Sequence, residues 1–151
     1  MAKLTDYMQN IVEVHKLGFV ATVCEDGTPN LSPKGTCLVL DDEHIMFGEI
    51  RSPNTRNNIR ERPVMEMNFV DVLSRKGFRA KGRAEYLARG TPEFGALLPR
   101  FAQWGELSER IKGIVKLRVE EASLLSSPAY DIGASEEALK AQWKNHFQSI
   151  A

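Results

Sequence analysis

The chain has 151 residues, with 20 Lys and Arg side chains balanced by 20 Asp and Glu, and its pI is near 6.8. This length suits one domain with a core of ordinary size, and the neutral balance excludes a general attraction to nucleic acid or to an anionic membrane. The N-terminus lacks the apolar core of a secretory signal, and no apolar run reaches membrane-spanning length. We therefore expect a soluble cytoplasmic protein that forms one domain over residues 1–151, without nucleic-acid or membrane partners.

A helix and a hairpin are predicted for the opening segment. Thr5 can cap a helix whose apolar residues recur at three- and four-residue spacing, and Gly18 is placed to end it. Two β-branched, apolar runs follow at 19–24 and 28–31, and the turn dipeptide at 26–27 joins them.

A second strand pair, at 35–40 and 45–48, leads into a short helix within 51–59. Ser52 can serve as the N-cap, and Pro53 fits the first helical position, where no amide donor is needed. The free amides and the dipole of such a helix start favour an anion, so the segment reads either as a phosphate site or as an ordinary capped helix. The polar side chains beside that start are Arg51, Asn54, Thr55 and Arg56.

The rest of the chain alternates strands and helices. Strands are predicted at 64–70, 78–87 and 114–119, a helix begins after Thr91, and a terminal helix runs over 135–147. The long strand alternates small or apolar residues with charged ones, so one of its faces belongs to the core and the other meets solvent or a charged interface. The core face would carry Phe78, Ala80, Gly82 and Ala84, and the charged face Arg79, Lys81, Arg83 and Glu85.

These elements predict a mainly β (α+β) fold, a small antiparallel barrel of about six strands with short flanking helices. The first connections are too short for the helical crossovers of a parallel sheet. The three histidines, His15, His44 and His146, lie too far apart in the sequence for a metal motif, so no metal site is expected. Cys24 and Cys37 lie in apolar runs without metal or redox spacing, which predicts two buried thiols.

Four segments, at 18–23, 26–30, 32–36 and 52–59, resemble in order and spacing the pyridoxamine 5'-phosphate oxidase-like family, the FMN-binding split barrels. The likeness extends over about 18–125. It implies a six-stranded antiparallel split β-barrel that forms a homodimer and binds FMN at the dimer interface. The phosphate would be held by the segment that begins at Arg51.

The same resemblance implies roles for single residues. Lys34 could place positive charge near N1 and O2 of the flavin ring, where reduction accumulates negative charge, while Gly35 and Gly48 permit a close approach of the backbone. Tyr130, or less directly Trp104, would reach toward the flavin of the partner subunit. The expected cofactor-binding residues are Ser32, Pro33, Lys34, Gly35, Phe47, Gly48, Arg51, Ser52, Asn54, Thr55, Asn58 and Tyr130.

The resemblance further implies an FMN-dependent oxidoreductase that moves a hydride or electrons between a small-molecule substrate and an electron donor. The chain departs from true pyridoxamine phosphate oxidases, because Asn54 and Thr55 stand where those enzymes carry an Arg-Lys pair, so oxidation of vitamin B6 is not expected. A flavin-binding or redox-sensing stress protein without turnover is the alternative, and a deazaflavin or haem is the alternative cofactor. No catalytic side chain is predicted.

Overall fold

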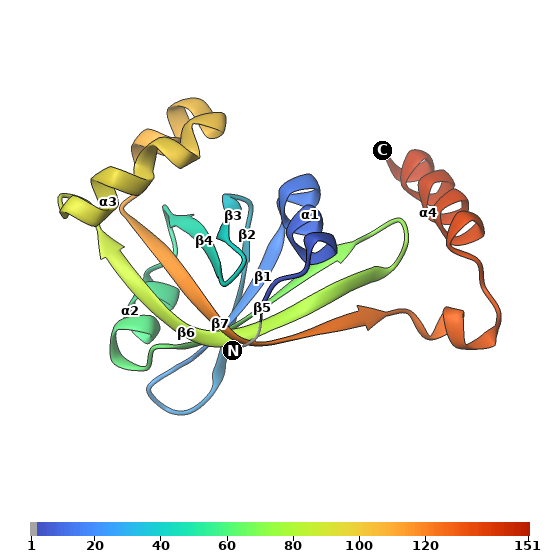
Figure 1. The fold of residues 1–151 in the computed structure, drawn as a ribbon, viewed down its shortest axis with the longest axis horizontal. Helices are drawn as coiled ribbons and strands as arrows, with labels where there is room; N and C mark the ends of the chain where they lie inside the picture. Colours follow the sequence, from blue (N-terminus) through green and yellow to red (C-terminus); the bar gives the residue numbers. More distant parts are fainter. Residues whose placement is uncertain (1–2) are drawn as a thin grey trace.

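The computed structural model describes residues 3–151, which form one seven-stranded antiparallel sheet with helices around it (Figure 1). The helices and strands follow in the order α1 (Asp6–His15), β1 (Gly18–Val23), β2 (Pro29–Lys34), β3 (Cys37–Asp41), β4 (His44–Glu49), α2 (Pro53–Glu61), β5 (Val64–Asp71), β6 (Lys76–Ala88), α3 (Pro92–Leu97), the 3-10 segment η1 (Leu98–Arg110), β7 (Gly113–Ser126), the 3-10 turn η2 (Pro128–Ile132) and α4 (Glu136–Ile150).

The sheet has the strand order β2-β1-β5-β6-β7-β4-β3 and stays open between its two edge strands. The predicted mainly β, antiparallel fold with flanking helices is confirmed, but the six-stranded split barrel is corrected to an open sheet of seven strands: each of the seven strand-like runs forms a strand, and β2 and β3 do not pair. The two residues between these edge strands explain the opening. Thr36 bonds to β4, where its hydroxyl donates to the Gly48 carbonyl at 2.9 Å, whereas β2 pairs only with β1.

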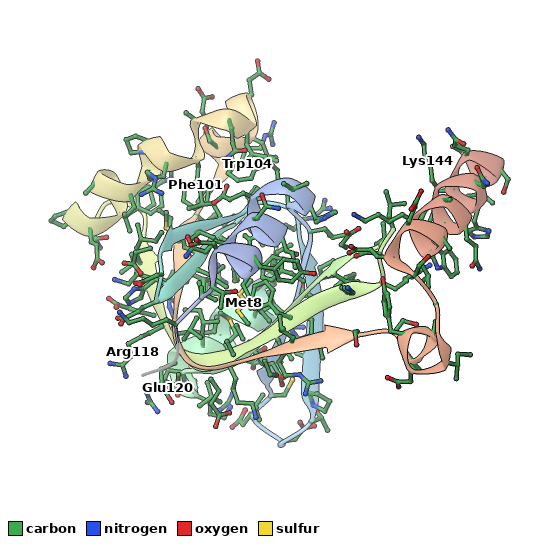
Figure 2. All side chains as sticks on the ribbon, turned by 45° about the vertical axis from the view of Figure 1, so that its right-hand side comes forward. Met8, Phe101, Trp104, Arg118, Glu120 and Lys144 are labelled. Carbon is green, nitrogen blue, oxygen red and sulfur yellow. The ribbon has the colours of Figure 1, made fainter. Side chains whose placement is uncertain are left out.

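Helix α1 packs against the inner face of the curved sheet, where Figure 2 shows Met8 inside the molecule. Its start agrees with the prediction, since the Thr5 hydroxyl accepts a hydrogen bond from the Met8 amide. Its end does not: Lys16, in the left-handed region at φ 54°, closes the helix. Gly18 instead opens β1, where a side chain would collide with the Phe69 ring 2.7 Å away. That glycine serves packing rather than helix termination.

Strand β6 confirms the predicted alternation. Phe78 and Ala80 are fully buried, and the charged residues between them and beyond are exposed. Arg79 pairs with Glu66 of the neighbouring strand at 2.6 Å. The charged residues therefore form the outer face of the sheet.

The C-terminal part of β7, η2 and α4 form an arm that stands away from the rest of the molecule (Figure 1). Strand β7 continues to Ser126, well past the predicted end at 119, because it stays paired with β6 as far as Lys76. Helix α4 is capped by Ser135 as expected and contacts the β5-β6 turn through Arg75, whose guanidinium stacks on Trp143 at 3.5 Å. Among the described residues, no helix combines the length and apolar character needed to cross a membrane.

The Cys37 thiol should make the stability of the protein sensitive to alkaline pH. Burial raises the pKa of this thiol to about 12. In an unfolded chain the same thiol has a pKa of about 8.5, so above that pH unfolding releases a proton. The unfolding free energy therefore falls as the pH rises toward 12, and this group contributes at most roughly 1.4 kcal/mol per pH unit to that fall. In urea titrations between pH 8 and 11, we expect a steeper loss of unfolding free energy in the wild type than in Cys37→Ala. Parallel curves would contradict this.

Candidate functional site

A cavity of about 780 Å³ lies beside the open edge of the sheet, between the turn that follows β2, the end of β4 and η1. This volume is in the range of small-molecule sites. Its lining residues are Pro33, Lys34, Gly35, Thr36, Gly48, Ile50, Arg51, Trp104, Leu107, Arg110 and Lys112.

The lining of this cavity is strongly positive. Four cationic side chains, Lys34, Arg51, Arg110 and Lys112, line it, and no acidic residue or histidine does so within the described chain. Such a concentration of one charge in a concave site attracts an anionic ligand. No group of three residues able to hold a metal ion occurs among residues 3–151.

A smaller hollow of about 190 Å³ lies at the start of α2 and meets the larger cavity at Arg51, which lines both. Its opposite wall is β2. The residues around it are Asn30, Leu31, Ser32, Arg51, Ser52, Pro53, Asn54 and Thr55. The two hollows lie on either side of Arg51 along the edge strand β2, and we refer to them together as the edge groove.

The start of α2 lacks the usual side-chain cap. The helix begins at Pro53 as predicted, but Ser52 makes no capping hydrogen bond. The side chain that bonds there is Glu49, whose carboxylate accepts from the Ser52 amide at 2.8 Å. The first amides of a helix have no acceptor within it, so those of Asn54 and Thr55, two residues that line the hollow, have no serine cap. This arrangement fits a phosphate group.

Lys34 lies at the junction of the groove and the core. Its ammonium donates to the Ser32 hydroxyl at 2.7 Å and stands 5.8 Å from the centre of the Phe47 ring. Burial lowers the pKa of Lys34, and the nearby Glu49 carboxylate opposes that shift. The Phe47 side chain itself is fully buried in the core, so only its neighbour Gly48 reaches the cavity.

The two glycines of the edge groove, Gly35 and Gly48, differ in the space around them. Around Gly35 a side chain would meet nothing within 4 Å, so its backbone is open to the cavity. At Gly48 a side chain would lie 2.6 Å from the Ile111 side chain. The open approach expected at both positions is therefore present at Gly35, whereas Gly48 is also required by packing.

Besides Phe47, two further predicted site residues, Asn58 and Tyr130, lie outside the groove. Asn58 faces the sheet, where its amide donates to the Thr22 hydroxyl at 3.1 Å. Tyr130 is on the C-terminal arm, and its hydroxyl donates to the Ser74 carbonyl at 2.6 Å. Within this chain Tyr130 lines neither hollow.

Sequence reasoning missed most of the wall that η1 contributes. The resemblance assigns Trp104 only a role toward the partner subunit, yet this residue lines the cavity of its own chain and packs on Phe101 with ring centres 5.7 Å apart (Figure 2). Arg110 and Lys112 carry no local motif. They reach the cavity because the end of η1 turns back beside the end of β4, where the Lys112 amide donates to the Glu49 carbonyl at 2.8 Å.

Comparison with known proteins identifies the family of this chain and structures that share its fold. The family model of pyridoxamine 5'-phosphate oxidase matches residues 4–125. The chain belongs to this family. It is similar to HupZ of Group A Streptococcus, with 30% identity, a TM-score of 0.71, and coverage of 82% of this chain and 95% of that one. A Lactobacillus delbrueckii protein named after pyridoxamine 5'-phosphate oxidase has 27% identity, a TM-score of 0.69 and the same two coverages. A search of functionally curated proteins found no match.

More distant structures share the fold alone, and their names differ in the ligand they mention. An FMN-binding protein of Syntrophomonas wolfei has 12% identity and a TM-score of 0.65, covering 80% of this chain and 84% of that one. An F420 reductase has 19% identity and a TM-score of 0.62, covering 80% of this chain and 98% of that one. HutZ, named as the heme storage protein of Vibrio cholerae, has 16% identity and a TM-score of 0.62, covering 82% of this chain and 94% of that one. Proteins of this fold are therefore not all named as oxidoreductases.

Proposed function

We propose that the protein binds FMN in the edge groove and serves as a flavin-dependent oxidoreductase. One observation carries the proposal: a small hollow at an uncapped helix start shares the lining residue Arg51 with a larger cationic cavity. FMN has the matching shape, with a compact dianion at one end and a wide planar ring at the other. The phosphate fits against the amides of Asn54 and Thr55, and the ring fits along the open backbone of Gly35.

Bound FMN would supply hydride or electron transfer at its ring, a chemistry that the protein tunes rather than performs. The residues of the chain bind and orient it. Lys34, held by Ser32, offers a positive charge beside the ring cavity, where it favours negative charge on a reduced ring. Trp104 and Leu107 add apolar surface to the lining, against which the ring of a flavin would pack.

A flavin fits this lining better than haem does. No histidine from the described residues lines either hollow, and a haem iron is commonly held by an axial histidine, cysteine, methionine or tyrosine. Of the residues that the structure describes, none that lines either hollow carries a carboxylate. A flavin-binding protein without turnover therefore remains the second candidate, because the groove presents no paired acid and base.

We further propose that the active form is a homodimer. Three apolar side chains remain exposed on adjacent strands of the open edge: Phe19 at 40%, Leu31 at 68% and Val64 at 42%. Leu31 also borders the phosphate hollow, so a second copy that covers this face would close the edge groove. Light scattering during size exclusion should give twice the monomer mass, and Leu31→Glu should shift it toward the monomer.

The absorption spectrum of the purified protein, reconstituted with FMN and passed through a desalting column, tests the proposal directly. We expect the flavin bands to co-elute with the protein. Reduction of the bound flavin by NADH or NADPH, followed by reoxidation with added acceptors, would support the oxidoreductase. A bound flavin that stays inert to every donor would support the binding protein, and protein that never retains FMN would overturn both.

A side chain at Gly35 should separate ligand binding from folding. Nothing lies within 4 Å of the position that the first side-chain atom would take, and this glycine lines the cavity. We expect Gly35→Val to leave the unfolding free energy within about 0.5 kcal/mol, as for other substitutions without clashes. The same change should weaken FMN binding about tenfold, because it fills space that the ring requires. Fluorescence titration with FMN and urea unfolding measure the two effects. Equal affinities in the two proteins would place the ring elsewhere.

A further inference from the structure

The most unusual charge in the molecule belongs to Glu49, at the end of β4. Of the charged side chains in residues 3–151, this is the one that is completely buried, with 0% of its surface exposed. A buried carboxylate is costly unless hydrogen bonds satisfy its oxygens. Nothing in the proposed binding of FMN requires Glu49 to touch the ligand, so its burial calls for another explanation.

Both carboxylate oxygens have partners. Oε1 accepts from the Ser52 amide at 2.8 Å, with the Ser52 hydroxyl 3.5 Å away, and Oε2 accepts from the Tyr86 hydroxyl at 3.4 Å. The charged neighbours are cations: the Lys34 ammonium interacts with Glu49, and Arg56 and Arg60 act on the Tyr86 hydroxyl. The carboxylate is therefore fixed in one orientation.

The backbone of Glu49 is equally fixed, because its carbonyl accepts from the Lys112 amide at 2.8 Å and its position pairs with Gly113 of β7. The side chain thus extends the rigid sheet to Ser52. It closes the turn 49–52, with Arg51 at the tip and the first residue of α2 directly after it. Arg51 and the helix start are the two parts of the phosphate hollow that this turn must orient.

The same bond also explains why Ser52 leaves the helix uncapped. At Thr5, Thr91 and Ser135 the N-cap hydroxyl accepts from an amide of its own helix. Ser52 instead turns toward Glu49, with φ −141° and ψ 69°, and makes no such bond. By holding Ser52, Glu49 leaves the first-turn amides to an external anion.

We propose that Glu49 is a positioning residue that sets the affinity of the edge groove for the phosphate of FMN, an inference that rests on the proposed function. Its role is geometric. As a charge it would repel a phosphate, whereas as an acceptor held in place it orients Arg51 and the amides that bind one. If the charge dominated, removing it would strengthen FMN binding. If the fixed acceptor dominates, displacing it should weaken FMN binding even when the charge is kept.

Three variants separate them, with the ratio of the riboflavin Kd to the FMN Kd as the readout. Glu49→Asp keeps the charge but shortens the reach to Ser52, and Glu49→Met keeps the volume without an acceptor. Both should lower the ratio about tenfold through weaker FMN binding, since charge-assisted bonds to the phosphate are lost. Glu49→Gln keeps an oxygen that can accept from the Ser52 amide, so it should retain the wild-type ratio within about threefold.

Each outcome decides between the alternatives. A ratio unchanged in Glu49→Asp and Glu49→Met, or lowered equally in Glu49→Gln, would overturn the positioning role. Equal losses of riboflavin and FMN affinity would also overturn it, because they would show a general structural effect. Circular dichroism and thermal unfolding identify a misfolded variant, and Glu49→Met serves if Glu49→Asp does not fold. Wild-type protein that binds neither flavin would overturn the proposed function and this inference together, whereas an unchanged ratio with tight wild-type binding would overturn the inference alone.

Discussion

Replacing Arg51 by glutamine is expected to weaken FMN binding by about one to two orders of magnitude. Arg51 is the residue shared by the two hollows, and within residues 3–151 no other cation lines the small hollow at the start of α2. A hydrogen bond to a charged group contributes about 1.5 to 3 kcal/mol. Each loss of about 1.4 kcal/mol in binding free energy raises the dissociation constant about tenfold. The Kd follows from quenching of flavin fluorescence on binding.

Two controls make this result specific. Riboflavin lacks the phosphate, so its affinity should change by no more than about twofold between wild type and Arg51→Gln. Arg118, on β7, lines neither hollow and is 53% exposed, so Arg118→Gln removes one positive charge without touching the groove (Figure 2). Equal weakening by the two substitutions would show that overall charge, not a phosphate contact, governs binding.

The sequence predicted the elements that depend on neighbours in the chain. The strand alternation around Phe78, the turn at 26–27 and the start of α2 at Pro53 are all present, because periodicity and turn chemistry are local properties. The family resemblance is confirmed. Most of the cofactor-binding residues that it implied line the edge groove.

The features that were missed depend on long-range contacts. Ser52 was expected to cap its helix, but the buried carboxylate of Glu49 competes for it. The open sheet could not be inferred, because strand-like runs do not tell which edges remain unpaired. Arg110 reaches the groove only through the fold of η1, which contains a turn at Gly105 with φ 55°. No local pattern in the sequence marks that path.

The largest loss of stability is expected for Phe78→Ala. Phe78 of β6 lies directly opposite Phe69 of β5, both are fully buried, and their rings stack with centres 5.5 Å apart. Truncation of a buried phenylalanine leaves a cavity and costs about 3 to 5 kcal/mol. The Phe69 ring also fills the space that a side chain at Gly18 of β1 would take, so relaxation into the cavity would disturb a third strand. Urea unfolding measures the loss.

Leu124 provides the matched control, because it pairs with Phe78 across the β6-β7 ladder but is 65% exposed. Strand β7 continues from this register into the C-terminal arm (Figure 1), and its Leu124 side chain is exposed there. Leu124→Ala should therefore change the unfolding free energy by no more than about 0.5 kcal/mol. Similar losses in the two variants would mean that the arm is packed against apolar surface in solution. Because Leu124 is exposed in a single chain, the second copy proposed above would be the first candidate for that surface, and the loss in Leu124→Ala would then depend on protein concentration.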